Sequence, residues 1–308
     1  LIAFFLAFAF YATTTGLIGP VYGDFIAKSI VRHRGWLYGG AQLIGGVMGA
    51  GAAALADRFL STLPYPVGIQ ACFWTAFGLS FLSLIFIANF HEVHYPDRAP
   101  RIRARELLAG IPGMLRGNPA YRWFLTARTA MALGTMGVGF AAAAALDRGL
   151  ATQDAALLAL VYLASQSAGG LLWGLIGDRV GWKRVLILAA GTLAVAMLVA
   201  VEARGIGPFA LTFILLGAVN SASTMGDPNI TYEVAPPAET SRYLGVTSTL
   251  LAPTLAVAPI IGAAITGIVS YEAVFLVAAA FAVVGLLIAA TRFVEPRRLV
   301  AITPPPVG

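Results

Sequence analysis

The residue types that catalyse reactions are scarce in this chain, and their spacing fits no enzyme. His91 and His94 lie three positions apart, whereas the zinc-binding pattern H-E-x-x-H places its histidines at i and i+4. The sequence contains no phosphate-binding loop of the form G-x-x-x-x-G-K-S/T. No Ser, His and Asp set can be assigned to nucleophilic catalysis. The sequence therefore predicts no catalytic residue, no metal and no cofactor, and indicates a protein that is not an enzyme.

The most informative single charge is Arg128, which lies inside a long apolar stretch. An arginine within membrane hydrocarbon costs at least a few kcal/mol unless it is paired or hydrated, so it normally faces the protein interior or a cavity. Arg128 is therefore a candidate contact for an anionic solute or a member of a charge network. The alternative is that its side chain reaches back to the lipid headgroups. Asp24 and Asp227 are expected near the ends of apolar stretches, so no buried proton-coupling acid is predicted.

Uncharged polar residues inside other apolar stretches are candidates for lining a solute pathway. The same residue types also form ordinary hydrogen bonds between membrane helices, and the sequence does not separate the two roles. Together with Arg128, the predicted pathway residues are Gln42, Gln166, Asn220 and Thr224.

Residues 174–184 read G-L-I-G-D-R-V-G-W-K-R, an apolar run that turns into a basic hairpin between two apolar stretches. Such a hairpin lies at a membrane surface, and clustered Lys and Arg mark that surface as cytoplasmic. Asp178 is expected at a helix end, where it can accept hydrogen bonds or meet the N-terminus of a neighbouring helix. A negative charge at that position is favoured by about 0.3–1 kcal/mol. The alternative is a local cap of the hairpin with no wider role.

The composition shows which elements must position these residues. Hydrophobic residues make up 59% of the chain and charged residues 11%, against about 25% charged in ordinary soluble domains. The mean hydropathy is +0.83. A chain of 308 residues cannot bury this much apolar surface in a single water-soluble core. The sequence therefore predicts an all-α integral membrane protein. Its net charge of +6 is concentrated in short loops, which indicates membrane orientation and not nucleic-acid binding.

Nine apolar stretches are long enough to cross about 30 Å of hydrocarbon. Basic residues gather in every other connection between them, so those connections and the C-terminus are predicted to face the cytoplasm. The predicted spans lie at about 1–22, 36–56, 68–90, 123–146, 152–176, 184–202, 206–226, 246–269 and 272–292.

The hairpin at residues 174–184 is similar to the loop signature G-x-x-x-D-R-x-G-x-K-R of the major facilitator superfamily, whose members carry small solutes across membranes. A modest internal repeat agrees with this resemblance: Gly23-Asp24 and Gly226-Asp227 lie about 203 residues apart, as expected for two parallel six-span halves. The resemblance implies a twelve-helix fold of two bundles, of which this chain resembles spans four to twelve. Three further spans are then expected before Leu1.

The resemblance also implies a division of the chain and a role for the hairpin. Residues 1–90 would form the last three spans of the first bundle, 91–118 a cytoplasmic linker, 119–296 a second six-helix bundle and 297–308 a cytoplasmic tail. In the resembled family this hairpin holds the two bundles in one conformation. The residues that match the signature are Gly174, Asp178, Arg179, Gly181, Lys183 and Arg184.

The predicted function is secondary active transport of a small solute by alternating access, which this chain alone is expected to perform incompletely. The predicted location is the cell membrane, with several passes and a cytoplasmic C-terminus. The predicted partners are an unidentified small solute and the lipid bilayer, with a coupling ion as a further candidate and no nucleic acid. The alternative is a non-transporting membrane sensor, a scaffold or an intramembrane enzyme.

Overall fold

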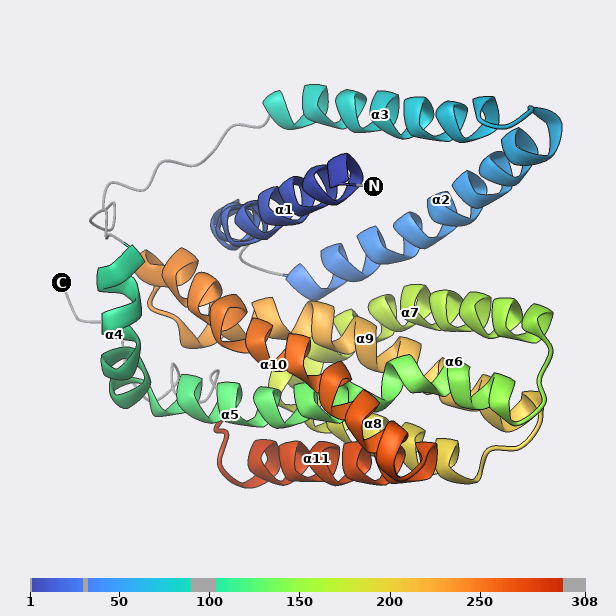
Figure 1. Ribbon diagram of the computed structural model, residues 1–308. Coiled ribbons are helices and arrows are strands. Elements are labelled where there is room, and N and C mark those ends of the chain that lie inside the picture. Colours follow the sequence, from blue (N-terminus) through green and yellow to red (C-terminus); the bar gives the residue numbers. More distant parts are fainter. Residues whose placement is uncertain (1, 30–32, 90–103, 296–308) are drawn as a thin grey trace.

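The computed structural model describes residues 2–29, 33–89 and 104–295, and all regular elements within these ranges are helices. The first part of the predicted linker, with His91 and His94, and the predicted tail lie outside the described residues. In chain order (Figure 1), the elements are α1 (Ile2–Ser29), α2 (Arg34–Thr62), α3 (Val67–Ala88), α4 (Ala104–Gly117), α5 (Pro119–Gly134), the short 3-10 helix η1 (Thr135–Gly137), α6 (Val138–Asp147), α7 (Thr152–Val180), α8 (Trp182–Glu202), α9 (Ile206–Val234), the short 3-10 helix η2 (Pro237–Glu239), α10 (Thr240–Ile268) and α11 (Tyr271–Thr291).

Among the described residues, eight helical segments are long and apolar enough to cross a membrane. Two of them join more than one element: α5, η1 and α6 form the segment Pro119–Asp147, and η2 and α10 form the segment Pro237–Ile268. The first predicted span, at about 1–22, lies within α1, a helix of 28 residues that is not among these eight. These findings confirm an all-helical integral membrane protein.

Several helices extend beyond the predicted spans. The span predicted at 206–226 is part of α9, which continues to Val234. The continuation carries the buried polar residues Asn229 and Thr231, so it is held by protein contacts and not by lipid. The helix therefore does not end with the apolar stretch, and Asp227 lies inside it, seven residues before its last residue.

Helices α4 to α11 pack into one body, and α1 to α3 lie along one side of it, with α2 beside α7 (Figure 1). The core of this body forms two clusters. One cluster, which includes Tyr121, Phe124 and Trp182, lies at the end that carries α4, the α7–α8 connection and the end of α11. We call this end the linker end. The other cluster, which includes Phe209 and Phe275, lies towards the opposite end, which we call the far end.

The linker helix α4 is amphipathic, and its apolar face packs against protein. Met114 is buried, and Leu107, Ile111 and Leu115 pack against the cluster at the linker end. The helical bundle therefore covers these four side chains wholly or in part, whereas Leu108 of the same helix is 55% exposed.

Helix α5 begins directly after this linker, and Asn118 caps its first turn. Asn118 Oδ1 accepts a hydrogen bond from Tyr121 N at 3.0 Å, and Asn118 Nδ2 donates to the carbonyl of Val234 at 2.8 Å. The first contact caps α5, and the second ties its start to the end of α9. Arg128 and Asp227, which these two helices carry, are thereby held in register.

Candidate functional site

The hairpin between α7 and α8 turns at Gly181, where any other residue would be strained. Gly181 has φ 97° and ψ 149°, a conformation that side chains disfavour. A Cβ at this position would also lie 2.6 Å from Glu295 Oε2. Lys183 Nζ donates to the carbonyl of Ala290 at 3.1 Å, which ties the hairpin to the end of α11. Arg179 and Arg184 are exposed.

Asp178, in the last turn of α7, contacts the start of α2. Its Oδ1 accepts from Gly35 N at 3.0 Å, and its Oδ2 accepts from Trp36 N at 2.9 Å. The N-cap residue of α2, His33, makes no capping hydrogen bond through its side chain. The first backbone N–H groups of a helix need acceptors and carry partial positive charge. The Asp178 carboxylate therefore caps α2 from a helix 142–143 residues further along the chain.

The backbones of α2 and α7 approach closely on the same face. A Cβ on Gly35 would overlap the carbonyl oxygen of Gly174, and a Cβ on Gly39 would lie 2.7 Å from the carbonyl oxygen of Gly170. Glycine is required at these positions because any side chain would push the two helices apart. The capping contact thus lies at the end of a tightly packed helix pair, and Gly174 of the hairpin is part of that packing.

A second set of contacts joins α2 to α9 near the same end. The hydroxyl groups of Tyr38 and Tyr232 lie 3.0 Å apart. The Arg34 guanidinium lies over the Tyr232 ring, 5.0 Å from its centroid. The linker end of the interface between α2 and the main body is therefore closed by polar and cation–π contacts, in addition to Asp178.

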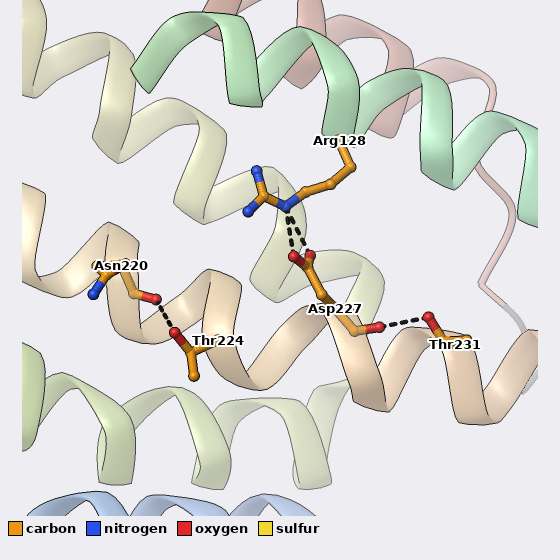
Figure 2. A network of polar contacts seen from close by, with 5 residues as sticks. All are labelled: Arg128, Asn220, Thr224, Asp227 and Thr231. Carbon is orange, nitrogen blue, oxygen red and sulfur yellow. Dashed lines mark hydrogen bonds and ion pairs between the residues drawn. The ribbon is translucent and has the colours of Figure 1, made fainter. Parts of the chain in front are cut away.

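Arg128 forms an ion pair with Asp227 inside the main body (Figure 2). Arg128 Nε lies 2.8 Å from each carboxylate oxygen of Asp227. Arg128 is only 6% exposed, so its side chain is enclosed by the protein. This ion pair is a contact of the kind expected for a charge network, and a role of Arg128 in binding an anionic solute stays a prediction. Its Nη1 is buried and has no hydrogen-bond partner among the described residues.

Sequence reasoning missed Asp227 as the partner of Arg128. The available signal was the repeat that pairs Gly226-Asp227 with Gly23-Asp24, which marked the position without indicating its partner. The Asp24 side chain lies outside the described part of the chain.

The other predicted pathway residues are distributed over three helices. Asn220 and Thr224 lie on α9 at the spacing that places them on the same side as Asp227, and Thr224 Oγ1 donates to the Asn220 carbonyl at 2.9 Å (Figure 2). Gln42 lies in the α2–α7 interface beside Gly170, and its Oε1 makes no hydrogen bond within the described residues. The Gln166 backbone packs against Gly217 of α9. Among the described side chains, the structure joins Arg128 only to Asp227.

The described residues contain no group of three or more His, Cys, Asp and Glu side chains that could hold a metal ion. The site is instead a set of charges at helix ends and inside apolar helices. Long apolar helices packed in this way define a membrane protein that crosses the bilayer several times.

Comparison with known families then identifies the family. The family model described as Major Facilitator Superfamily matches residues 122–306, which is more than half of the 308 residues. The chain therefore belongs to this superfamily of membrane transporters. A search of curated proteins gives no match.

Proposed function

We propose that this protein is a secondary active transporter that carries a small solute across the cell membrane by alternating access. Membership of a transporter superfamily supports the transport function. The observation that carries the mechanism is the contact of Asp178 with the start of α2, because it joins helices that the proposed division assigns to different bundles. In the proposed orientation, the linker end and the C-terminus face the cytoplasm, since the basic connections gather there.

The Asp178 contact has the properties of a reversible latch. Each charge-assisted hydrogen bond contributes about 1.5–3 kcal/mol, before the screening that an exposed end brings. When α2 moves away, water replaces the carboxylate at the N–H groups of Gly35 and Trp36, so the open state is accessible at modest cost. When the contact forms again, the close packing of Gly35 and Gly39 of α2 against α7 defines the relative position of the two helices. We propose that this latch favours the state that is closed at the linker end.

We propose that the solute pathway passes along the polar residues between α2, α5, α7 and α9. Arg128 supplies the positive charge of this pathway and is held by Asp227, while its Nη1 remains available as a donor. The neutral residues of the pathway are Gln42, Gln166, Asn220 and Thr224. A solute that carries an anionic or strongly accepting group fits this set best.

Distance measurements between the halves test the latch. Spin labels at Trp36→Cys and Ala238→Cys report on the linker end, and labels at Ser61→Cys and Gln153→Cys report on the far end, in a background with Cys72→Ser. All four label positions are exposed, and the hydrogen bond of Trp36 comes from its backbone. Asp178→Asn is expected to lengthen the first distance and to shorten the second, because it removes the charge that caps α2.

The matched control is Asp154→Asn on the same helix. Asp154 Oδ2 accepts from Ala151 N at 2.9 Å, so it caps only the start of its own helix. This substitution is expected to leave both distances unchanged. Unchanged distances in Asp178→Asn as well would refute the latch, and Asp178 would then be a static cap.

Transport itself is tested by reconstitution. Vesicles that contain the protein together with any chain that precedes Leu1 should take up a solute saturably from a panel of carboxylates, phosphates, sugars and amino acids, and Arg128→Gln should abolish the uptake of an anionic solute. Absence of uptake across the panel, in vesicles where the spin-label distances show a folded protein, would favour a sensor or scaffold instead.

A further inference from the structure

Asp227 occupies one edge of the Arg128 guanidinium and leaves the other unused. Both carboxylate oxygens lie 2.8 Å from Arg128 Nε, and Figure 2 shows the two terminal nitrogens directed away from the carboxylate. Nη1 is buried and has no hydrogen-bond partner among the described residues. Because a guanidinium carries its five N–H donors in a planar fork, a second anion can bind at the outer edge of Arg128.

The Asp227 carboxylate is more accessible than its partner. Its side chain is 21% exposed, against 8% for the side chain of Arg128. Asn220 and Thr224 lie on the same side of α9 as Asp227, and neither of them is fully buried. A proton can therefore reach Asp227 along the face that also carries neutral residues of the proposed pathway.

Among the described residues, Arg128 is the only charge that acts on Asp227. The helices that pack against α9 carry further charges at the linker end, but none of these acts on Asp227. They include Arg34 of α2, Arg122 of α5, Asp178 of α7, Lys183 of α8 and Arg242 of α10, and α9 itself carries Glu233. The hydroxyl groups of Tyr38 and Tyr232 contact each other. The protonation of Asp227 is therefore governed by what Arg128 binds.

The charge of the site changes when an anion binds to it. Arg128 and Asp227 together carry no net charge, and arginine does not lose its proton in proteins. A bound carboxylate would leave one uncompensated negative charge in an enclosed site, which is costly away from water. A proton on Asp227 removes this charge and releases Arg128 to the incoming carboxylate. A phosphate monoester carries about −1.5 to −2 charges at pH 7, so a single proton would not neutralise it.

We propose that the solute is a monovalent carboxylate and that Asp227 takes up one proton each time this solute binds to Arg128. The inference rests on the proposed function, and it names the solute class and the coupling ion of the same pathway. The empty site then holds the ion pair, and the loaded site holds Arg128, the carboxylate and an uncharged Asp227. Both forms are neutral, so neither carries a net charge through hydrocarbon when the protein changes conformation. Loss of the proton on the other side restores the ion pair and displaces the carboxylate.

Proton and solute fluxes in vesicles test the inference. The vesicles contain the protein together with any chain that precedes Leu1, and they enclose a pH-sensitive dye. The probes are labelled gluconate and lactate, because Asn220 and Thr224 offer hydrogen bonds to the hydroxyl groups of a hydroxycarboxylate; flux into protein-free vesicles is subtracted. The wild type is expected to take up one proton with each anion and to respond to the pH gradient. The membrane potential should have no effect, since it does no work on a neutral form.

Asp227→Asn separates net uptake from exchange. In this variant the loaded site is neutral without a proton, whereas the empty site keeps the charge of Arg128 without a partner. Net uptake is expected to fall about 100-fold, the factor that corresponds to about 3 kcal/mol for a buried charge that has lost its partner. Exchange of labelled for unlabelled solute needs no empty return, so it should continue and no longer depend on pH. The matched control, Glu202→Gln, removes an exposed carboxylate at the end of α8 and should leave both rates unchanged.

Infrared difference spectroscopy tests the same linkage without any solute. Removing the charge of Arg128 acts on Asp227 as an anion bound to Arg128 does. Arg128→Gln is therefore expected to show the C=O band of a protonated carboxylic acid at neutral pH, which the wild type lacks. Combining it with Asp227→Asn should remove the band and so assign it to Asp227.

Several results would overturn the inference and leave the transport function in place. They are uptake without protons, uptake that needs sodium ions or follows the membrane potential, and uptake of other solutes but of neither probe. An ionised Asp227 in Arg128→Gln would have the same consequence, as would loss of exchange in an Asp227→Asn variant that keeps its helices by circular dichroism. Absence of all uptake would remove the proposed function, and the inference with it.

Discussion

Replacing Asp227 with alanine leaves the Arg128 guanidinium buried without its counter-charge. Both carboxylate oxygens of Asp227 lie 2.8 Å from Arg128 Nε, and Arg128 is 6% exposed. Alanine is a good helix former, so the change does not weaken α9 through its backbone preference. The effect of Asp227→Ala therefore reports on the ion pair itself.

The expected loss in the free energy of unfolding follows from this burial. Removing one partner of a buried pair costs about 3–5 kcal/mol, whereas replacing both partners by apolar residues is often neutral. Asp227→Asn keeps one acceptor oxygen and is expected to cost about half as much, because a hydrogen bond to a charged donor still contributes about 1.5–3 kcal/mol. Arg128→Leu with Asp227→Leu should be more stable than either single substitution.

The measurement is reversible unfolding of the purified protein in mixed micelles with rising dodecyl sulfate, followed by circular dichroism. A double-mutant cycle over Arg128 and Asp227 gives their coupling energy. Thr224→Val serves as the control, since Thr224 is exposed and bonds only to a carbonyl of its own helix, and it should change stability by less than about 0.5 kcal/mol. A loss below about 1 kcal/mol in Asp227→Ala, with no coupling, would refute the reasoning from a buried pair.

Two further predictions concern the ends of the main body, and the same unfolding assay measures both. Gly181→Ala should lower the free energy of unfolding more than Gly205→Ala does. Both glycines have positive φ, at 97° and 76°, and the backbone strain alone costs about 1–3 kcal/mol, but only a Cβ at Gly181 would also meet a neighbour, the Glu295 carboxylate. Equal losses of stability in the two variants would contradict this reasoning. Arg148→Gln should cost about 3 kcal/mol, because Arg148 Nη1 donates at 2.9 Å to the carbonyls of Ala200 and Ala203 and its Nη2 lies 2.5 Å from Glu272 Oε1. Glu272→Gln should cost less than about 1 kcal/mol, because the Glu272 side chain is 45% exposed and solvent weakens its ion pair. An equal cost of the two substitutions would show that the ion pair, and not the carbonyl contacts, stabilises this end.

The sequence determined the helices and the class of protein, because the hydrocarbon of a membrane acts on each helix separately. Every segment that crosses it must be apolar, about twenty residues long and satisfied in its own hydrogen bonds. These are local properties, so the helices α2 and α7, for example, follow from hydropathy alone. The hairpin at residues 174–184 is local in the same way, and it led to the family that the comparison then confirmed.

The helix ends and the partners of the charges were decided only by the tertiary structure. Helix α9 continues past its apolar stretch because protein surrounds it, which places Asp227 inside the body. Asp227 then pairs with Arg128, 99 residues away, and Asp178 caps α2 across 142–143 residues. Likewise, only the packing shows that the apolar face of the linker helix α4 covers the core at the linker end. Hydropathy describes whether each residue prefers lipid or water. It does not specify which charge pairs with which, or which side chain caps a given helix end, because those contacts depend on how helices distant in the sequence pack.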